Sequence, residues 1–246
     1  MKAFTGQVVL VSGAGGRIGR AVALGFARQG AVVAANDLSP LNLDETASQA
    51  QALGCQCRTY VFDIAKKMPL QALVGQVLDD CARIDILINA APVQPGAALL
   101  EMDEWDWQRT LEVNLGGPFF AMQTIGRVMR EQGAGAIINV ILPPQALAEH
   151  PGLAALSASQ AGLLSLTLAA AQELAPHHIR VNAVLPALLP VDQLPNPAVE
   201  QAHRPGRVAY RPVEDPDRLA ALVEKVLFLC TPAAQAITGQ VFPIHT

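Results

Sequence analysis

The chain of 246 residues is poor in charged and aromatic side chains. Charged residues make up 15% of it and aromatic residues 4%, against 51% hydrophobic residues, and the formal net charge is −4. This balance supplies neither the basic surface that nucleic-acid binding requires nor an attraction to anionic membrane lipids. We therefore expect no nucleic-acid partner and no membrane partner. The high apolar share also indicates surfaces that are buried against other subunits.

Metal-binding and redox motifs are also missing. The four cysteines (Cys55, Cys57, Cys81 and Cys230) lack the spacing of a metal finger, and the histidines do not cluster with carboxylates, so no metal site is expected. The first residues lack the charged-then-apolar pattern of a secretory leader. The longest apolar run, 161–171, is too short to cross a bilayer. These features predict a cytoplasmic protein.

Apolar runs of strand length alternate with helical patterns along the whole chain. Such alternation predicts an α/β fold with a doubly wound, seven-stranded parallel sheet and helices on both faces. Strands are expected near 7–12, 31–36, 57–62, 85–89, 135–141, 179–184 and 239–243. Helices are expected near 17–29, 42–53, 66–82, 101–131, 152–174 and 216–230. No repeat or linker divides the chain, so residues 1–246 are predicted to form one domain.

A glycine-rich turn follows the first expected strand. The buried-strand run Val8–Val11 leads into the sequence SGAGGRIG at 12–19, and then into a helical pattern. Glycines at such a turn let the backbone approach a pyrophosphate, and the helix N-terminus supplies donors and a positive dipole. The strand, turn and helix together predict a dinucleotide site that includes Gly13, Arg17, Ile18 and Gly19.

Two carboxylates end later strands. Asp37 lies 18 residues after Gly19 and can accept hydrogen bonds from an adenosine ribose. Its charge would repel a 2′-phosphate, which favours NAD over NADP. Asp63 ends the third expected strand and precedes Ile64. Both carboxylates could instead simply end strands and cap turns, as aspartate commonly does.

From about Thr5 to Pro243 the chain resembles the short-chain dehydrogenase/reductase family, which has a Rossmann-like fold. The turn at 12–19 is similar to the family's TGxxxGxG, with Ser12 for threonine and Arg17 for the middle glycine. The resemblance adds Asp63, Ile64 and Asn89 to the expected cofactor contacts. It also implies that 186–213, which is shortened and rich in proline, covers the substrate. One departure is Pro92 where the family has glycine, because proline removes a backbone donor.

The same resemblance identifies three catalytic positions with unsuitable side chains. The family's Tyr-x-x-x-Lys falls at Leu156 and Gln160, and its serine falls at Leu142; only Asn114 matches a catalytic member. Leucine neither titrates nor donates a hydrogen bond, and glutamine carries no charge. Positioned acid–base groups contribute roughly 10²–10⁴-fold in rate. No catalytic residue is therefore predicted.

These observations predict a catalytically inactive subunit. It would pair, as a dimer or tetramer, with an active NAD-dependent short-chain dehydrogenase that oxidises a hydroxyacyl-CoA or a similar secondary alcohol. The resemblance implies interfaces through 101–131 with 152–174, and through 216–243. One alternative is an active oxidoreductase that uses groups such as His150, Tyr210 or Asn114; another is a dinucleotide- or metabolite-sensing protein. The sequence leaves open the substrate, the partner and whether NAD binds.

Overall fold

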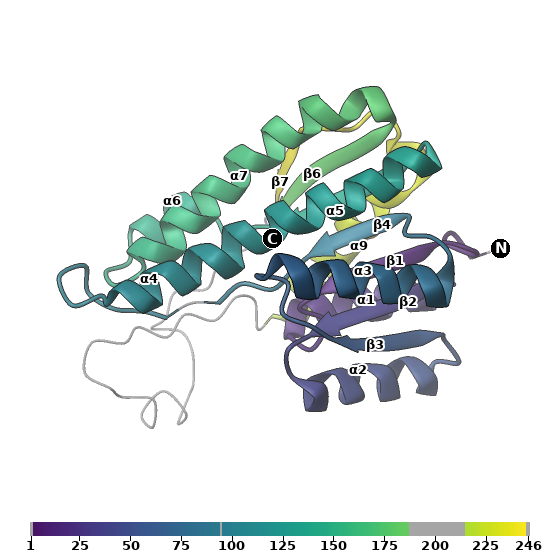
Figure 1. Cartoon of the computed structure of the whole chain (residues 1–246), viewed down its shortest axis with the longest axis horizontal. Coiled ribbons are helices and arrows are strands. Elements are labelled where there is room, and N and C mark those ends of the chain that lie inside the picture. The colour runs from purple at the N-terminus through teal and green to yellow at the C-terminus, as the bar shows by residue number, and fades with distance from the viewer. Residues whose placement is uncertain (1, 94, 187–214, 245–246) are drawn as a thin grey trace.

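All seven strands form one parallel sheet in the computed structural model, which describes residues 2–93, 95–186 and 215–244. The strand order is β3-β2-β1-β4-β5-β6-β7, with helices covering both faces (Figure 1). The strands are β1 (Val8–Ser12), β2 (Val32–Asp37), β3 (Cys57–Val61), β4 (Ile86–Asn89), β5 (Gly135–Val140), β6 (Ile179–Leu185) and β7 (Val241–Pro243). The α/β, doubly wound, Rossmann-like fold predicted from the sequence is confirmed.

The helices form two layers. Helices α1 (Arg17–Arg28) and α9 (Pro216–Cys230) pack against each other on one face of the sheet. The other face carries α3 (Lys67–Cys81), α5 (Gly117–Gln132) and α7 (Ala154–Leu174), as Figure 1 shows. The remaining α-helices in the described part of the chain are α2 (Pro40–Ala52), α4 (Glu104–Leu111) and α6 (Pro144–Ala148). Side-chain caps begin α2, α4 and α9, where Ser39, Asp103 and Asp215 accept bonds from backbone N–H groups.

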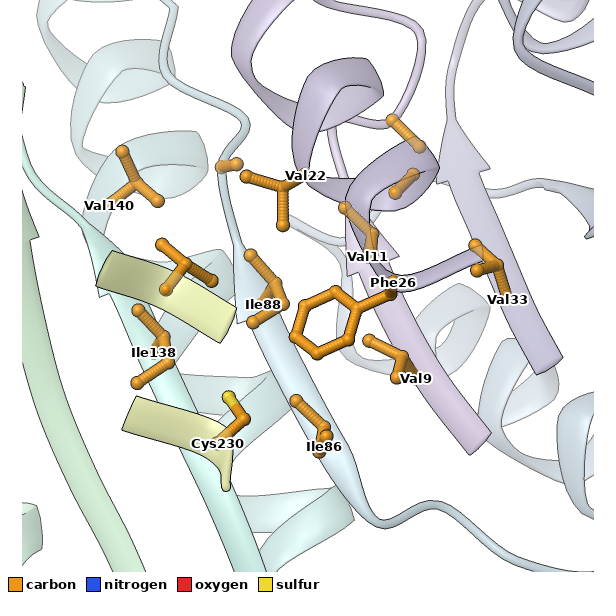
Figure 2. Close-up of a cluster of buried hydrophobic side chains, with 14 of the residues drawn as sticks. Val9, Val11, Val22, Phe26, Val33, Ile86, Ile88, Ile138, Val140 and Cys230 are labelled. Carbon is orange, nitrogen blue, oxygen red and sulfur yellow. The ribbon is translucent and has the colours of Figure 1, made fainter. Parts of the chain in front are cut away.

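Each face of the sheet has its own hydrophobic core. Successive side chains of a strand point to opposite faces, so Val9 and Val11 join the cluster under α1 and α9, while Val8 and Leu10 join the cluster under α3, α5 and α7. Figure 2 shows the first cluster, in which Phe26 of α1 lies over the strands. Burial on both faces explains why the central strands are apolar runs rather than alternating patterns.

The single helix predicted over 101–131 is wrong in one respect. The structure contains α4, a π-helical turn η1 (Glu112–Gly116) and then α5. At this turn Asn114 is buried, with its side chain hydrogen-bonded to both the N–H and the carbonyl of Val93. A π-turn widens the helix by one residue and is frequent at functional sites.

Helix α7 carries the predicted interface. Together with the turn that follows it, Ala154–His177 is long and apolar enough to cross a membrane by length and composition alone, contrary to the length argument above. A soluble core helix passes the same test, and α7 packs against β6.

The outer face of α7 exposes Ala158, Ala161, Ser165 and Ala169. The oligomer and the absence of a membrane partner stay predictions, as do the cytoplasmic location and the single domain.

Candidate dinucleotide-binding and active site

A cavity of about 450 Å³ opens beside the carboxyl ends of the central strands. Strand β1 pairs with β2 on one side and with β4 on the other. The chain therefore winds in opposite directions from β1, which is where doubly wound sheets bind their ligands. The cavity is lined by Gly13, Gly16, Arg17, Ile18, Asn36, Asp37, Leu38, Phe62, Asp63, Ile64, Ala90, Ala91, Pro92, Val93, Arg109 and Val113.

The turn between β1 and α1 depends on its glycines. Gly13 has φ +73°, and a Cβ there would lie 2.5 Å from the Ala90 carbonyl oxygen. A Cβ on Gly19 would lie 2.1 Å from the Gly13 oxygen. Both glycines allow a close backbone approach that a side chain would block. Gly13 lines the cavity, whereas Gly19 packs behind the turn and is not part of the cavity wall. Gly16 caps α1 and leaves the helix N-terminus open to the cavity.

Asp37 ends β2, as predicted, and its side chain lines the cavity. Its two oxygens accept hydrogen bonds from the N–H of Gly15 (3.0 Å) and from the N–H of Ser39 (3.1 Å). The carboxylate therefore braces the glycine turn. Each carboxylate oxygen has two lone pairs, so each retains one that can accept a bond from a ligand hydroxyl.

Asp63 and Ile64 also lie on the cavity wall. One oxygen of Asp63 accepts from the N–H of Ala65 (3.0 Å), and the other pairs with Arg109 at 3.2 Å. Arg109 lines the cavity too, which the sequence analysis missed. It lies on α4, far from Asp63 in sequence, and no local pattern marks it. Its contact with Glu112 three residues later is the one signal that could have drawn attention to it.

Asn89, the last predicted cofactor contact, lies apart from this cavity wall. It is buried, and it lines a second, smaller cavity of about 10 Å³. That cavity shares Ile64, Ala91 and Pro92 with the large one. Its other lining residues are Ser12, Asn114, Pro118, Val140, Gln160 and Leu163. The structure thus brings Asn89, Asn114 and Gln160 together at the inner end of the crevice.

The leucines at the expected catalytic positions lie in a hydrophobic cluster. Leu142 follows β5 and Leu156 lies on α7; both are almost completely buried and pack with Leu147 and Leu153. The Gln160 carbonyl oxygen accepts a 2.7 Å bond from the N–H of Leu142. Positions 142, 156 and 160 are therefore adjacent in space, and none of the three side chains there can exchange a proton near neutral pH.

Two further candidates for acid–base chemistry lie in or near this region. Asn114 donates to Ser159 Oγ at 3.1 Å, and Ser159 donates in turn to the Leu156 carbonyl. Both of these side chains therefore serve the structure of the π-turn and α7. His150 follows α6 and is partly buried, with its N–H bonded to the Leu147 carbonyl. Tyr210 and most of the segment 186–213 lie outside the described residues.

The cavity fits the nucleotide part of a dinucleotide. The backbone at Gly13 comes so close to Ala90 that any Cβ there would clash, so the turn needs glycine. The N-terminus of α1 faces the cavity, and the Asp37 carboxylate can still accept hydrogen bonds from a ligand. Among residues 2–93, 95–186 and 215–244, no group of three His, Cys, Asp or Glu side chains could hold a metal.

Comparison with known proteins agrees with this geometry. The profile of the family "short chain dehydrogenase" matches residues 7–196. The chain is 35% identical to a 3-oxoacyl-[acyl-carrier-protein] reductase FabG of Thermotoga maritima, over 97% of the chain and 96% of that protein. It is 33% identical to the (2S)-[(R)-hydroxy(phenyl)methyl]succinyl-CoA dehydrogenase subunit BbsD of Thauera aromatica, over 96% and 93%. A crystal structure of NAD⁺-bound xylitol dehydrogenase superimposes with a TM-score of 0.82 at 28% identity, covering 99% of both chains.

The chain belongs to the short-chain dehydrogenase family. The prediction of a catalytically inactive subunit is contradicted by these comparisons, because relatives matching nearly the full length are named reductases and dehydrogenases. They indicate an active oxidoreductase, as in the first of the two alternatives. Three side chains predict inactivity, whereas the similarity over nearly the full length of the chain indicates an oxidoreductase.

Proposed function

We propose that this chain is an oxidoreductase that interconverts a carbonyl and a hydroxyl group by using a nicotinamide dinucleotide. The observation that supports this best is the crevice at β1, β2 and β4, in which the glycine turn, the α1 N-terminus and Asp37 line one cavity. The family match and the dehydrogenases at 33–35% identity support the reaction class. The bound dinucleotide supplies the hydride acceptor or donor.

Different residues of the crevice bind different parts of the dinucleotide. The N–H groups at the start of α1, with Gly13 and Gly16 keeping the approach open, bind the pyrophosphate. Asp37 binds the adenosine ribose and favours NAD over NADP, since a 2′-phosphate would lie beside its charge. Asp63, held by Arg109, and Ile64 form the adenine side of the cavity.

Proton transfer uses a group other than the side chains at 142, 156 and 160. Buried leucines exclude water from that region, and Gln160 is held by the backbone of Leu142. Candidates are His150 and Tyr210, because an imidazole and a phenol can each donate or accept a proton. The substrate is a small carbonyl compound or its alcohol; the reductases and dehydrogenases among the relatives suggest 3-oxoacyl thioesters and secondary alcohols as the first to be tested.

The test is turnover by the purified chain alone, measured through the nicotinamide absorbance with both dinucleotides and a panel of 3-oxoacyl thioesters, ketones and secondary alcohols. Gly16→Leu should abolish turnover, because Gly16 lies on the cavity wall. The matched control is Gly75→Leu, since Gly75 is exposed on α3 with nothing within 4 Å of its Cβ position. Turnover lost in His150→Ala or in Tyr210→Phe identifies the proton-transfer group. Binding of dinucleotide without turnover of any substrate would refute the proposal.

Cofactor choice is tested separately by Asp37→Asn. Two like charges about 4 Å apart interact by about 1 kcal/mol in water and by about 4 kcal/mol at an effective dielectric constant of 20. Removing the carboxylate charge should therefore shift the ratio of the NADP and NAD dissociation constants by roughly tenfold or more towards NADP. Asp63→Asn is the matched control, because both dinucleotides present the same adenine to it. A ratio that shifts equally in the two variants would contradict the role assigned to Asp37.

A further inference from the structure

A second large cavity lies at the opposite edge of the sheet from the dinucleotide crevice. Its volume is about 530 Å³, compared with about 450 Å³ for the crevice. Gln7, Asp85, Ala134 and His178 line it, and each of them directly precedes a strand. Because the strands are parallel, these four positions meet at the amino-terminal edge of the sheet. The two cavities share no lining residue.

Arg180, the second residue of β6, lines this cavity with a charge that the chain compensates only in part. Its Nη1 donates to the carbonyls of Leu229 and Ala234. Carbonyls at the end of a helix carry a partial negative charge, which suits a cation. Among the described residues, however, Arg180 forms no ion pair with a carboxylate. Burial lowers the pKa of this guanidinium, as expected for a charge without a full counter-charge.

The other two nitrogen atoms of the guanidinium, Nε and Nη2, are available to a ligand. Neither has a hydrogen-bond partner in the described part of the chain, and neither belongs to the fully buried atoms that lack one. Both are therefore reached by solvent. Nε and one terminal nitrogen of arginine present two parallel N–H bonds, which match the two oxygens of a carboxylate.

The surroundings of Arg180 favour a ligand with one negative charge over a phosphate dianion. Helix α9 ends here, so it presents carbonyl oxygens, whereas helices that bind phosphate present N–H groups at their beginning. Asp85 adds a carboxylate to the same wall, although Arg83 donates to both of its oxygens and compensates its charge. A dianion would be repelled by these oxygens more strongly than a monoanion.

The rest of the wall suits the body of a small organic acid. Ile86 and Cys230, labelled in Figure 2, line the cavity and also belong to the buried cluster beneath α1 and α9. Gln7 contributes an amide whose Oε1 is buried without a partner in the described part of the chain. A hydroxyl of a ligand could donate to that oxygen. Apolar walls with a few polar groups are typical of sites for small molecules.

We propose that this cavity binds a small organic carboxylate, whose two oxygens accept hydrogen bonds from Nε and Nη2 of Arg180. The apolar part of the ligand packs on Ile86 and Ile179, and a hydroxyl, where the ligand has one, donates to Gln7. The site does not rest on the dinucleotide binding proposed above, because it lies at the other edge of the sheet.

The experiment compares benzoate with benzamide, which have the same shape and differ in charge, by isothermal titration calorimetry. Gln235 lies exposed on the cavity wall, so Gln235→Lys and Gln235→Glu change the charge there without disturbing the core. Gln51→Lys and Gln51→Glu are the matched controls, since Gln51 is exposed on α2 and lines neither cavity. Arg180→Gln removes the guanidinium itself. A crystal of the unaltered chain with benzoate locates the ligand.

Benzoate should bind more tightly than benzamide by roughly 10-fold or more, because its hydrogen bonds to Arg180 are charge-assisted. Gln235→Lys should tighten benzoate binding and Gln235→Glu should weaken it, each by roughly 2- to 10-fold, as expected for one unit charge several ångströms away at a partly exposed site. Benzamide binding and the Gln51 variants should be unchanged. Arg180→Gln should remove the preference for benzoate, and the crystal should show the carboxylate on Arg180.

Three results would overturn the proposal. One is a benzoate affinity that does not exceed that of benzamide, or that is the same in both Gln235 variants. Another is benzoate bound in the dinucleotide crevice of the crystal. The third is tighter binding of inorganic phosphate than of benzoate, which would identify a site for dianions. The Gln235 variants and the crystal remain decisive even if Arg180→Gln does not fold, because Arg180 also bonds to Leu229 and Ala234.

Discussion

Thr167→Val should destabilise the protein much more than its small change in shape suggests. Thr167 is fully buried in α7, where it donates to the Leu163 carbonyl and accepts from Asn139. Valine has nearly the same shape and the same β-branching, so packing and helix propensity change little. The loss falls on Asn139, whose amide keeps only a 3.5 Å contact with the sulfur of Met122. Leaving a buried donor unsatisfied costs about 1–3 kcal/mol.

The chain offers a matched control in Thr110→Val. Thr110 is also fully buried in a helix, and its hydroxyl donates to the Asp106 carbonyl at 2.7 Å. It lacks the second bond to a buried amide that Thr167 makes among the described residues. We therefore expect Thr110→Val to cost less than about 0.5 kcal/mol, since the carbonyl it served already accepts within the helix.

The measurement is urea unfolding of the unaltered chain and both variants, compared at equal slope. The difference in the free energy of unfolding between the two variants gives the cost of leaving the Asn139 amide without its acceptor. Equal destabilisation by the two substitutions would show that the hydrogen bond from Asn139 to Thr167 does not contribute to stability, and would refute the prediction.

Three further predictions follow from other parts of the structure. Gly75→Ala should raise the free energy of unfolding by about 0.5–1 kcal/mol, since alanine favours the helix at this exposed site, and thermal unfolding measures it. Burial raises the pKa of the Cys230 thiol from 9.0 to about 12. The folded state thus holds this proton more tightly than the unfolded state, so stability declines as pH rises above about 9; Cys230→Ala should flatten that part of the unfolding profile, and an unchanged slope would contradict the assignment. Leu156→Tyr with Gln160→Lys should change turnover by far less than the roughly 10²–10⁴-fold of a positioned acid–base group, because Leu142 stays apolar and the buried cluster must reorganise; a gain of that full size in steady-state assays would show the pocket to be ready for both side chains.

Local patterns were sufficient to predict the fold and several of the residues that line the cavity beside β1. Strand and helix periodicities depend on neighbours within a few residues, and all seven expected strands agree with the structure to within two residues at each end. Glycines before a helix and a carboxylate after a strand are also local signals, so Gly13 and Asp37 could be placed on the cavity wall. The break in 101–131 was missed, because the π-turn at η1 depends on Val93, which lies 21 residues from Asn114.

The function of this chain could not be predicted from the three side chains at the expected catalytic positions alone. Leu142, Leu156 and Gln160 predicted inactivity, yet relatives that match nearly the full length of the chain are named reductases and dehydrogenases. A substitution read from sequence shows which chemistry a position has lost, but it does not show which neighbouring group can supply that chemistry.

The sequence by itself determined the order of elements, the doubly wound sheet and the glycine turn beside β1, because these follow from periodicity and turn chemistry. Only the tertiary structure decided the direction of each buried amide. Asn89, Asn139 and Thr167 come from β4, β5 and α7, and their hydrogen bonds join residues 28 and 50 positions apart. The direction of each amide depends on all of these bonds at once, and no local pattern carries that information.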